Sequence, residues 1–239
     1  MKWLLITSIG LYLFGSFRRP FLAGGLLAGL SYLAVRGVEL GRLPLVGPHD
    51  TLVFLAVSIG LMALPFLFSP ALENSGTFSW GAGFMAAFFT LLALPLPSFS
   101  MPLPPILRTL WFELHVALAF FAYALFGIGA ILGGMFLAKG ERMLLDLLYR
   151  AALVGYTFFS ASMVSGGIWG YYAWGTYWLW TPKELWTSIL WLFYSFWLHV
   201  RLRGGGGDKV LAWCGIAGFA VALFTYLGVS ILMKSSHSF

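Results

Sequence analysis

The stretch Trp169–Arg201, WGYYAWGTYWLWTPKELWTSILWLFYSFWLHVR, is the most informative part of this chain of 239 residues. Six of the chain's eleven tryptophans fall within its first 23 residues. Tryptophan and tyrosine collect at both edges of a bilayer, but such an interfacial belt accounts for only about one or two tryptophans per helix end. The density seen in this stretch therefore favours an aromatic platform for a ligand over an interfacial belt.

A cation and an imidazole accompany these tryptophans. Lys183 follows the densest part of the stretch, and His199 lies one helix length further along the chain. Aromatic faces, a basic group and metal-ligating histidines together suit a large, flat, anionic ring that contains a metal ion. The pattern therefore predicts a haem site.

The composition is that of an integral membrane protein. The chain is 60% hydrophobic and 9% charged, and its mean hydropathy is +0.89. A chain this apolar cannot present a soluble surface. Its net charge of +6 is spread over the loops without a long basic run, which indicates membrane topology and excludes a nucleic-acid-binding surface. The single cysteine, Cys214, forms neither an internal disulfide nor a CxxC redox motif.

The hydropathy pattern predicts an all-α integral membrane protein, built as one bundle of about eight transmembrane helices. A span needs about 20 apolar residues. We see no internal repeat and no soluble domain, so residues 1–239 are expected to form a single transmembrane domain. The expected spans cover residues 3–16, 21–35, 51–69, 80–96, 111–138, 150–168, 184–202 and 209–233.

The loop charges predict the orientation, because cytoplasmic loops carry an excess of Lys and Arg. One side holds eight cations in short connections, namely Arg18, Arg19, Lys139, Arg142, Arg150, Arg201, Arg203 and Lys209. The other side holds six, namely Lys2, Arg36, Arg42, Arg108, Lys183 and Lys234. We expect the first side to be cytoplasmic. This places both termini and the Trp-rich loop, about residues 169–183, on the outer side.

Two histidines are expected at the outer side. His115 begins the fifth span one helical turn after Trp111, and His237 lies just past the last span. Together they are suited to hold one iron axially, with the Trp-rich loop between them. The alternatives are a buried, hydrogen-bonded histidine at position 115 and a polar tail residue at position 237.

His199 is expected near the cytoplasmic end of the seventh span. The 15 residues from Glu184 to His199 carry the chain about 22 Å through the membrane. Glu184, Ser188, Trp191, Ser195 and His199 share one stripe of this helix, which is expected to face protein or a cavity because polar groups avoid lipid. His199 is thus a candidate ligand of a second, inner haem. His49, in contrast, is expected to be a solvated loop histidine.

The sequence Thr181-Pro182-Lys183-Glu184 has the form of a capping box. Thr181 is expected as the N-cap, proline as the first helical residue and Glu184 as the third. The cap would hold the tryptophan platform at a defined height, and Lys183 would point outward to meet a ring propionate.

The sequence WGTYWLWTPKELW followed by LHVR resembles the Trp-rich (WWD-type) signature of the haem-handling proteins of cytochrome c maturation. The PKE sequence and the His-Ser-Phe ending resemble the CcsA (ResC) branch more than the related CcmC branch. The resemblance covers about residues 111–239 well and is weaker before them. It implies haem b (iron protoporphyrin IX), passage of haem outward and thioether attachment to an apocytochrome c CxxCH.

The resemblance also implies the site residues and the partners. The outer haem would be ligated by His115 and His237, and His199 would pair with a histidine of a CcsB (ResB)-type membrane protein. Apocytochrome c and upstream thiol-reducing proteins would be further partners, in a bacterial cytoplasmic or thylakoid membrane. We expect the outer haem to contact Trp111, Trp169, Trp174, Trp178, Trp180, Lys183 and Trp186.

One departure from the family pattern concerns Thr181, where the family usually has aspartate. Both residues are good N-caps, so the cap itself is expected to survive. If the aspartate has a chemical role, this chain lacks it, which leaves open a haem exporter or chaperone without ligase activity. A b-type electron-transfer cytochrome and a transporter that does not handle haem are two further interpretations. A b-type cytochrome would need two histidines at equal depth on facing helices, whereas His115 and His199 are expected at opposite ends. A transporter would need polar groups near mid-membrane, whereas the centres of these spans are apolar.

Overall fold

The computed structural model describes residues 1–14, 19–72, 76–98, 100 and 102–233, and this part of the chain is helical without strands. The chain divides into two compact units, Met1–Pro102 and Leu103–Phe239. The single bundle expected over residues 1–239 stays a prediction.

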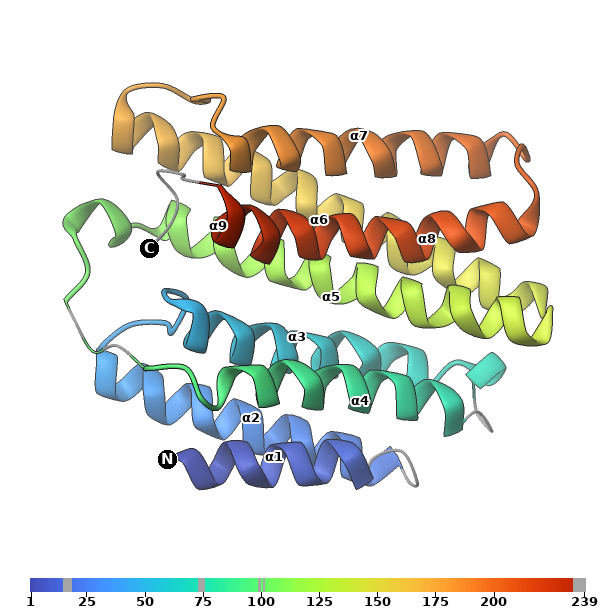
Figure 1. The fold of residues 1–239 in the computed structure, drawn as a ribbon, viewed down its shortest axis with the longest axis horizontal. Helices are drawn as coiled ribbons and strands as arrows, with labels where there is room; N and C mark the ends of the chain where they lie inside the picture. Colours follow the sequence, from blue (N-terminus) through green and yellow to red (C-terminus); the bar gives the residue numbers. More distant parts are fainter. Residues whose placement is uncertain (15–18, 73–75, 99, 101, 234–239) are drawn as a thin grey trace. The chain divides into compact units, whose positions relative to one another are not determined.

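In its described residues, the first unit contains four α-helices that pack as neighbours in an antiparallel arrangement (Figure 1). Helix α1 contacts α4 closely at Gly83, because a Cβ atom there would collide with the backbone oxygen of Tyr12. Small residues allow such close helix approach in membranes. The elements are α1 (Lys2–Phe14), α2 (Arg19–Leu40), α3 (Pro48–Leu67), the short 3₁₀ helix η1 (Pro70–Leu72) and α4 (Gly76–Ala93).

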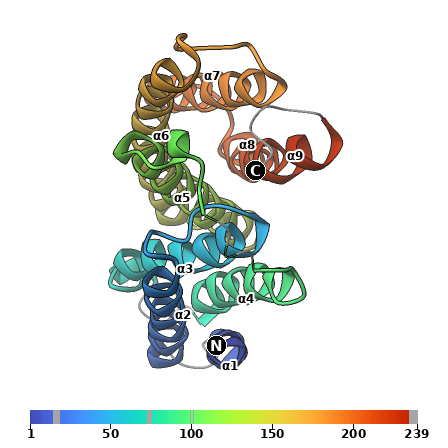
Figure 2. The ribbon, with the colours of Figure 1, turned by 90° about the vertical axis from the view of Figure 1, so that its left-hand side faces the viewer.

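The second unit is built on α5, which packs against α6 and α8, while α7 contacts both α6 and α8 (Figure 2). At the α5–α8 contact, a Cβ atom on Gly133 would lie 2.9 Å from the backbone oxygen of Ala212, so glycine is needed there. The elements are the 3₁₀ helix η2 (Pro105–Leu107), α5 (Leu110–Lys139), α6 (Arg142–Trp174), α7 (Pro182–Leu202), α8 (Asp208–Leu223), the π-helical turn η3 (Phe224–Gly228) and α9 (Val229–Leu232).

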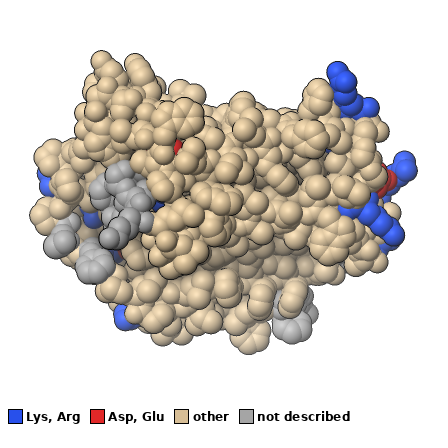
Figure 3. All heavy atoms as spheres, turned by 45° about the horizontal axis from the view of Figure 1, so that its top comes forward, with Lys and Arg blue, Asp and Glu red and all other residues tan. Residues whose placement is uncertain are grey.

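The two ends of the second unit differ in chemistry. The start of α5, the α6–α7 connection and α9 lie at one end, and the α5–α6 and α7–α8 turns lie at the other (Figure 1). Lys and Arg side chains gather at the latter end (Figure 3). There Arg142 pairs with Asp208 at 3.3 Å, and Arg201 pairs with Asp146 at 2.5 Å. Aromatic residues mark the opposite end.

The prediction of an all-α membrane protein is confirmed. In the described part of the chain, six helices are long and apolar enough to cross a membrane: α2 to α6 and the continuous helix Asp208–Leu232. Helix α1 is shorter, and α7 has 21 residues. A helix satisfies its own backbone hydrogen bonds, which is why apolar stretches of this length span a bilayer as helices.

Candidate functional site

The connection between α6 and α7 is shorter than the sequence indicates, because α6 continues through Trp174. Trp169 and Trp174 therefore lie on the last turns of α6, which corrects the expected loop of about residues 169–183. The helix ends at Gly175, whose φ of 73° is left-handed and whose N–H donates to the oxygen of Tyr171. A left-handed glycine is the usual helix terminator, and Gly175 is the first residue after Arg142 with a left-handed φ.

His115 lies in the second turn of α5 and is held by α6. Its Nδ1 donates a hydrogen bond to the backbone oxygen of Ser162 at 2.9 Å, and the Ser162 hydroxyl donates to the backbone oxygen of His115 at 2.8 Å. A carbonyl oxygen only accepts, so Nδ1 carries the proton and Nε2 keeps its lone pair. This tautomer is the one in which Nε2 ligates a metal.

Trp169 forms one wall beside this imidazole. Its indole lies nearly parallel to the His115 ring, with the centroids 6.4 Å apart and an interplanar angle of 13°. The indole is buried, and its Nε1 donates to the backbone oxygen of Ile106 at 2.7 Å. Phe112 and Trp174 contact the same indole at 5.3 and 4.8 Å between centroids. Trp169 therefore orients His115 from a fixed position.

The space beside His115 depends on a glycine of α6. A Cβ atom on Gly166 would lie 2.5 Å from Nδ1 of His115, closer than real Cβ contacts allow. On the neighbouring Gly167, a Cβ atom would meet only the backbone oxygen of Tyr177, at an ordinary 3.6 Å. Gly166 thus leaves the room that the imidazole occupies.

The remaining tryptophans near this end are accessible to different degrees. Trp111, one turn before His115, is 37% exposed. Trp174 and Trp178 are half-buried, and the backbone oxygen of Trp178 accepts from the Thr176 hydroxyl at 3.2 Å. Trp180 is 69% exposed and has a φ of 58°, the only positive φ of a non-glycine residue in the described part of the chain. The exposed faces of these rings are available to a flat ligand.

The predicted capping box at the start of α7 is confirmed. The Thr181 hydroxyl accepts from the Glu184 N–H at 3.4 Å, and Oε2 of Glu184 accepts from the Thr181 N–H at 2.8 Å. Oε2 also accepts from the N–H of Leu179 at 3.0 Å. The box fixes where the loop ends and the helix begins.

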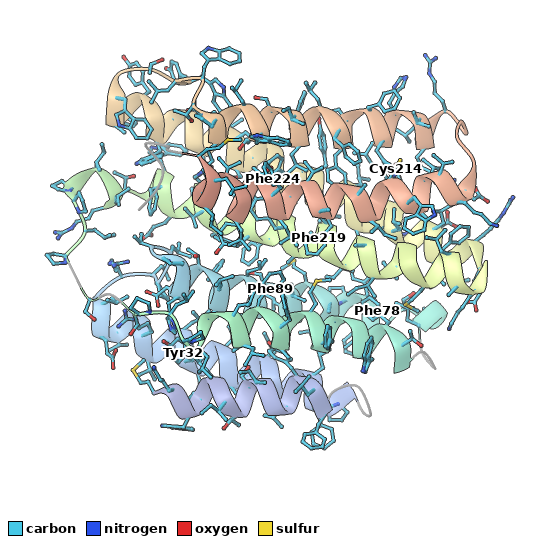
Figure 4. All side chains as sticks on the ribbon, viewed as in Figure 1. Tyr32, Phe78, Phe89, Cys214, Phe219 and Phe224 are labelled. Carbon is cyan, nitrogen blue, oxygen red and sulfur yellow. The ribbon has the colours of Figure 1, made fainter. Side chains whose placement is uncertain are left out.

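Lys183 and Trp186 join the start of α7 to α9 and η3, respectively. Nζ of Lys183 donates to the hydroxyl of Ser230 on α9 at 3.0 Å. Trp186 packs edge-on against Phe224, labelled in Figure 4, with the centroids 4.5 Å apart. Lys183 precedes the expected span 184–202, and burial lowers the pKa of its ammonium group.

His199 lies at the opposite end of α7, in its last turn, with an exposed side chain. Trp191 and Ser195 of the stripe leading to it face α6, in line with the expectation that the stripe faces protein, whereas His199 itself does not. Nε1 of Trp191 donates to the Ser160 hydroxyl at 2.9 Å, and the hydroxyls of Ser195 and Tyr156 are 2.8 Å apart. His237, predicted with His115 as an outer haem ligand, lies outside the described residues.

The prediction that His49 is a solvated loop histidine is wrong. It lies in the first turn of α3 and is buried between two partners: Tyr32 (labelled in Figure 4), whose hydroxyl is 2.7 Å from Nε2, and Ala93, whose backbone oxygen is 2.8 Å from Nδ1. Arg36, expected in a loop, is a buried residue of α2 that pairs with Asp50 at 3.4 Å. Sequence reasoning missed this cluster, although Arg36 and Asp50 are oppositely charged residues that bracket one short connection.

The end of the second unit that carries His115 and the α6–α7 connection fits a ring that carries its own metal better than a bare ion. Among the described residues, no three or more His, Cys, Asp or Glu side chains gather as a metal site. Iron in a porphyrin takes its equatorial ligands from the ring and needs only axial ligands from the protein. An imidazole whose Nε2 has no hydrogen-bond partner in the described part of the chain, together with aromatic faces and an ammonium group, meets that need.

Comparison with known proteins agrees with this chemistry. Residues 47–237 match the family described as "Cytochrome C assembly protein". The "Cytochrome c biogenesis protein CcsA" of Chlamydomonas reinhardtii is 31% identical over 87% of this chain and 64% of its own length. The protein of the same name from Parasynechococcus marenigrum (strain WH8102) is 31% identical over 87% of this chain and 81% of its own length.

A solved structure shares the fold. The chain resembles "Cytochrome c Heme Lyase CcmF" with a TM-score of 0.73 at 16% sequence identity, over 98% of this chain. The match covers 45% of the CcmF chain, and the chain spans less than two thirds of the Chlamydomonas relative.

Proposed function

This chain belongs to the cytochrome c assembly protein family, and from that premise we propose that it holds haem at the outer membrane face and presents it to apocytochrome c. The haem would be attached there to a CxxCH motif through thioether bonds, in a complex with a CcsB (ResB)-type protein. The observation that carries the proposal is the His115 imidazole. Its Nε2 lone pair is fixed by the Nδ1–Ser162 hydrogen bond, beside a parallel tryptophan.

The proposed haem site combines ligands from several elements. His115 and His237 would be the axial ligands of haem b. Trp111, Trp169, Trp174, Trp178, Trp180 and Trp186 would form the aromatic surroundings. Of these, Trp169 is buried and acts through His115, whereas exposed rings such as Trp180 would meet the porphyrin directly.

The electrostatic surroundings of Lys183 favour a contact between its ammonium group and a haem propionate. It lies in the first turn of α7, where the helix dipole disfavours a cation. No ion pair joins Lys183 to an acidic side chain of the described residues, and its ammonium bonds a neutral hydroxyl on Ser230. The neighbouring carboxylate of Glu184 accepts from backbone amides instead. A carboxylate of the cargo would supply the missing countercharge.

The contribution of the protein to ligation would be positioning. The haem supplies the vinyl groups that react with the cysteine thiols. No side chain at this end is an evident nucleophile, so His115, the tryptophans and Lys183 would orient the ring and shield its iron. Holding reactants in register can lower a barrier by roughly 7–11 kcal/mol.

The inner site of the proposal is His199. It lies at the charged end of the second unit, beside Arg201, and we place this end in the cytoplasm from the density of Lys and Arg. A histidine from the CcsB-type partner would complete the coordination. The Trp-rich loop and both termini would then lie on the outer side of a bacterial cytoplasmic or thylakoid membrane.

A haem exporter or chaperone without ligase activity is the second candidate. Thr181 favours it, because the family usually has aspartate at this position. A b-type cytochrome fits less well, since His115 and His199 lie at opposite ends of the second unit.

The absorption spectrum of the purified protein tests the proposal. After reconstitution with haem, we expect the sharp bands of a low-spin haem with two imidazole ligands. Failure to bind haem in the presence and absence of the partner would exclude every haem-handling function.

A further inference from the structure

The carboxylate of Glu184 bonds the backbone on both sides of one tryptophan. Oε2 accepts from the N–H of Thr181 at 2.8 Å and from the N–H of Leu179 at 3.0 Å. The residue between these two amides is Trp180. The carboxylate is buried and lies at the start of α7, where the helix dipole favours a negative charge.

Trp180 has a backbone conformation that needs such support. Its φ of 58° is left-handed, a region that a bulky residue rarely adopts. Strained conformations persist only where the surrounding structure holds them, and they cluster at functional sites. Trp180 is nevertheless 69% exposed, so no packed core holds the residue in place.

A capping box alone does not account for this arrangement. The box requires that Thr181 accept from the Glu184 amide and that Glu184 accept from the Thr181 amide. The bond to Leu179 lies outside the box, two residues before the N-cap and beyond Trp180. One carboxylate oxygen therefore accepts hydrogen bonds from the residues on both sides of Trp180, in addition to its part in the cap of α7.

We propose that Glu184 is a positioning residue for haem, which acts by clamping the backbone on both sides of Trp180. The clamp holds Trp180 in its left-handed conformation and so fixes the direction in which the exposed indole meets the porphyrin. This inference rests on the proposed function, because it takes the ligand of the Trp-rich loop to be haem. Glu184 itself does not contact the ligand.

Three variants separate the clamp from the helix cap. Glu184→Ala removes the acceptor of both amides and keeps the Thr181 hydroxyl as the cap of α7. Glu184→Gln keeps a carbonyl oxygen that can accept from both amides without the charge. Thr181→Val is the matched control, since it removes the capping hydroxyl and leaves the two amide bonds to Glu184.

The first measurement is hydrogen exchange of the Leu179 and Thr181 amides, which needs no haem. We expect exchange in Glu184→Ala to be about tenfold faster or more, as for the loss of a charge-assisted hydrogen bond. Exchange should be intermediate in Glu184→Gln and unchanged in Thr181→Val. Slow exchange of both amides in Glu184→Ala would overturn the clamp, whether or not the protein binds haem.

The second measurement is the absorption spectrum and reduction potential of the reconstituted haem. Glu184→Ala should shift both, Glu184→Gln should restore them toward the wild type, and Thr181→Val should match the wild type. A wild-type protein that binds haem, with identical spectra and potentials in Glu184→Ala, would overturn the positioning role. A wild-type protein that binds no haem would overturn the proposed function and the haem-facing half of this inference, while the exchange result would still decide the clamp.

Discussion

The Nδ1 atom of His115 lies 2.9 Å from the backbone oxygen of Ser162, a hydrogen bond between α5 and α6. Because the acceptor is a backbone carbonyl, it is present whatever side chain occupies position 162. The bond fixes the proton on Nδ1 and leaves Nε2 as the nitrogen that could ligate a metal ion.

Gly166→Ala should disturb the His115 ring. The new Cβ atom would lie 2.5 Å from Nδ1, and an overpacked site of this kind typically costs about 1–3 kcal/mol of unfolding free energy. We expect a lower haem content and a weaker low-spin spectrum. Gly167→Ala is the matched control, because its Cβ atom would meet the nearest atom at 3.6 Å. Equal spectra for the two variants would show that the ring has room to move.

Thr181→Ala should cost about 1 kcal/mol of unfolding free energy, as loss of an N-cap side chain typically does. Thr181→Asp should be nearly neutral, because aspartate is an equally good cap. Chemical denaturation in detergent measures both. A large rise in thioether attachment with Thr181→Asp at unchanged stability would show that the carboxylate takes part in the chemistry, and that this chain is an attenuated form.

Lys183→Met should weaken the binding of haem about tenfold or more, the size expected for loss of a charge-assisted hydrogen bond. Haem dimethyl ester lacks the carboxylates, so the wild type and Lys183→Met should bind the ester with equal affinity. Titrations followed by absorbance compare the four affinities. Equal affinities of both proteins for haem itself would exclude the propionate contact.

His199→Ala should reduce the haem that reaches the outer site in cells. The same variant should still bind haem added to the purified protein, because the outer ligands are intact. Haem content after expression and after reconstitution separates the two routes. A variant loaded like the wild type by both routes would show that His199 has no part in haem delivery.

Local signals explain which parts of this structure the sequence predicts. The cap at Thr181 depends on residues three positions apart, and it appears as expected. His115 at the start of α5, Trp174 at the end of α6 and Lys183 at the start of α7 occur at one end of the second unit. Antiparallel helices bring these alternate connections together (Figure 1). Hydropathy also predicts the membrane helices, since an apolar stretch has no alternative to internal hydrogen bonding in lipid.

The features that the sequence does not predict depend on distant partners or on backbone conformation. Burial of His49 requires Tyr32 and Ala93, which belong to two other helices. The tautomer of His115 depends on a carbonyl 47 residues away. The left-handed Trp180 has no sequence signature, because tryptophan does not favour that conformation. Such features need the packed structure.

The most direct test of the haem assignment is the absorption spectrum of the His115→Gly protein after reconstitution with haem. We expect loss of the low-spin bands and their return when free imidazole enters the vacated space, and His237→Gly should behave in the same way. Return of the bands would show that the lesion is a missing ligand rather than a misfolded protein. Low-spin spectra identical to that of the wild type in both variants, without imidazole, would contradict the assignment of His115 and His237 as the axial ligands.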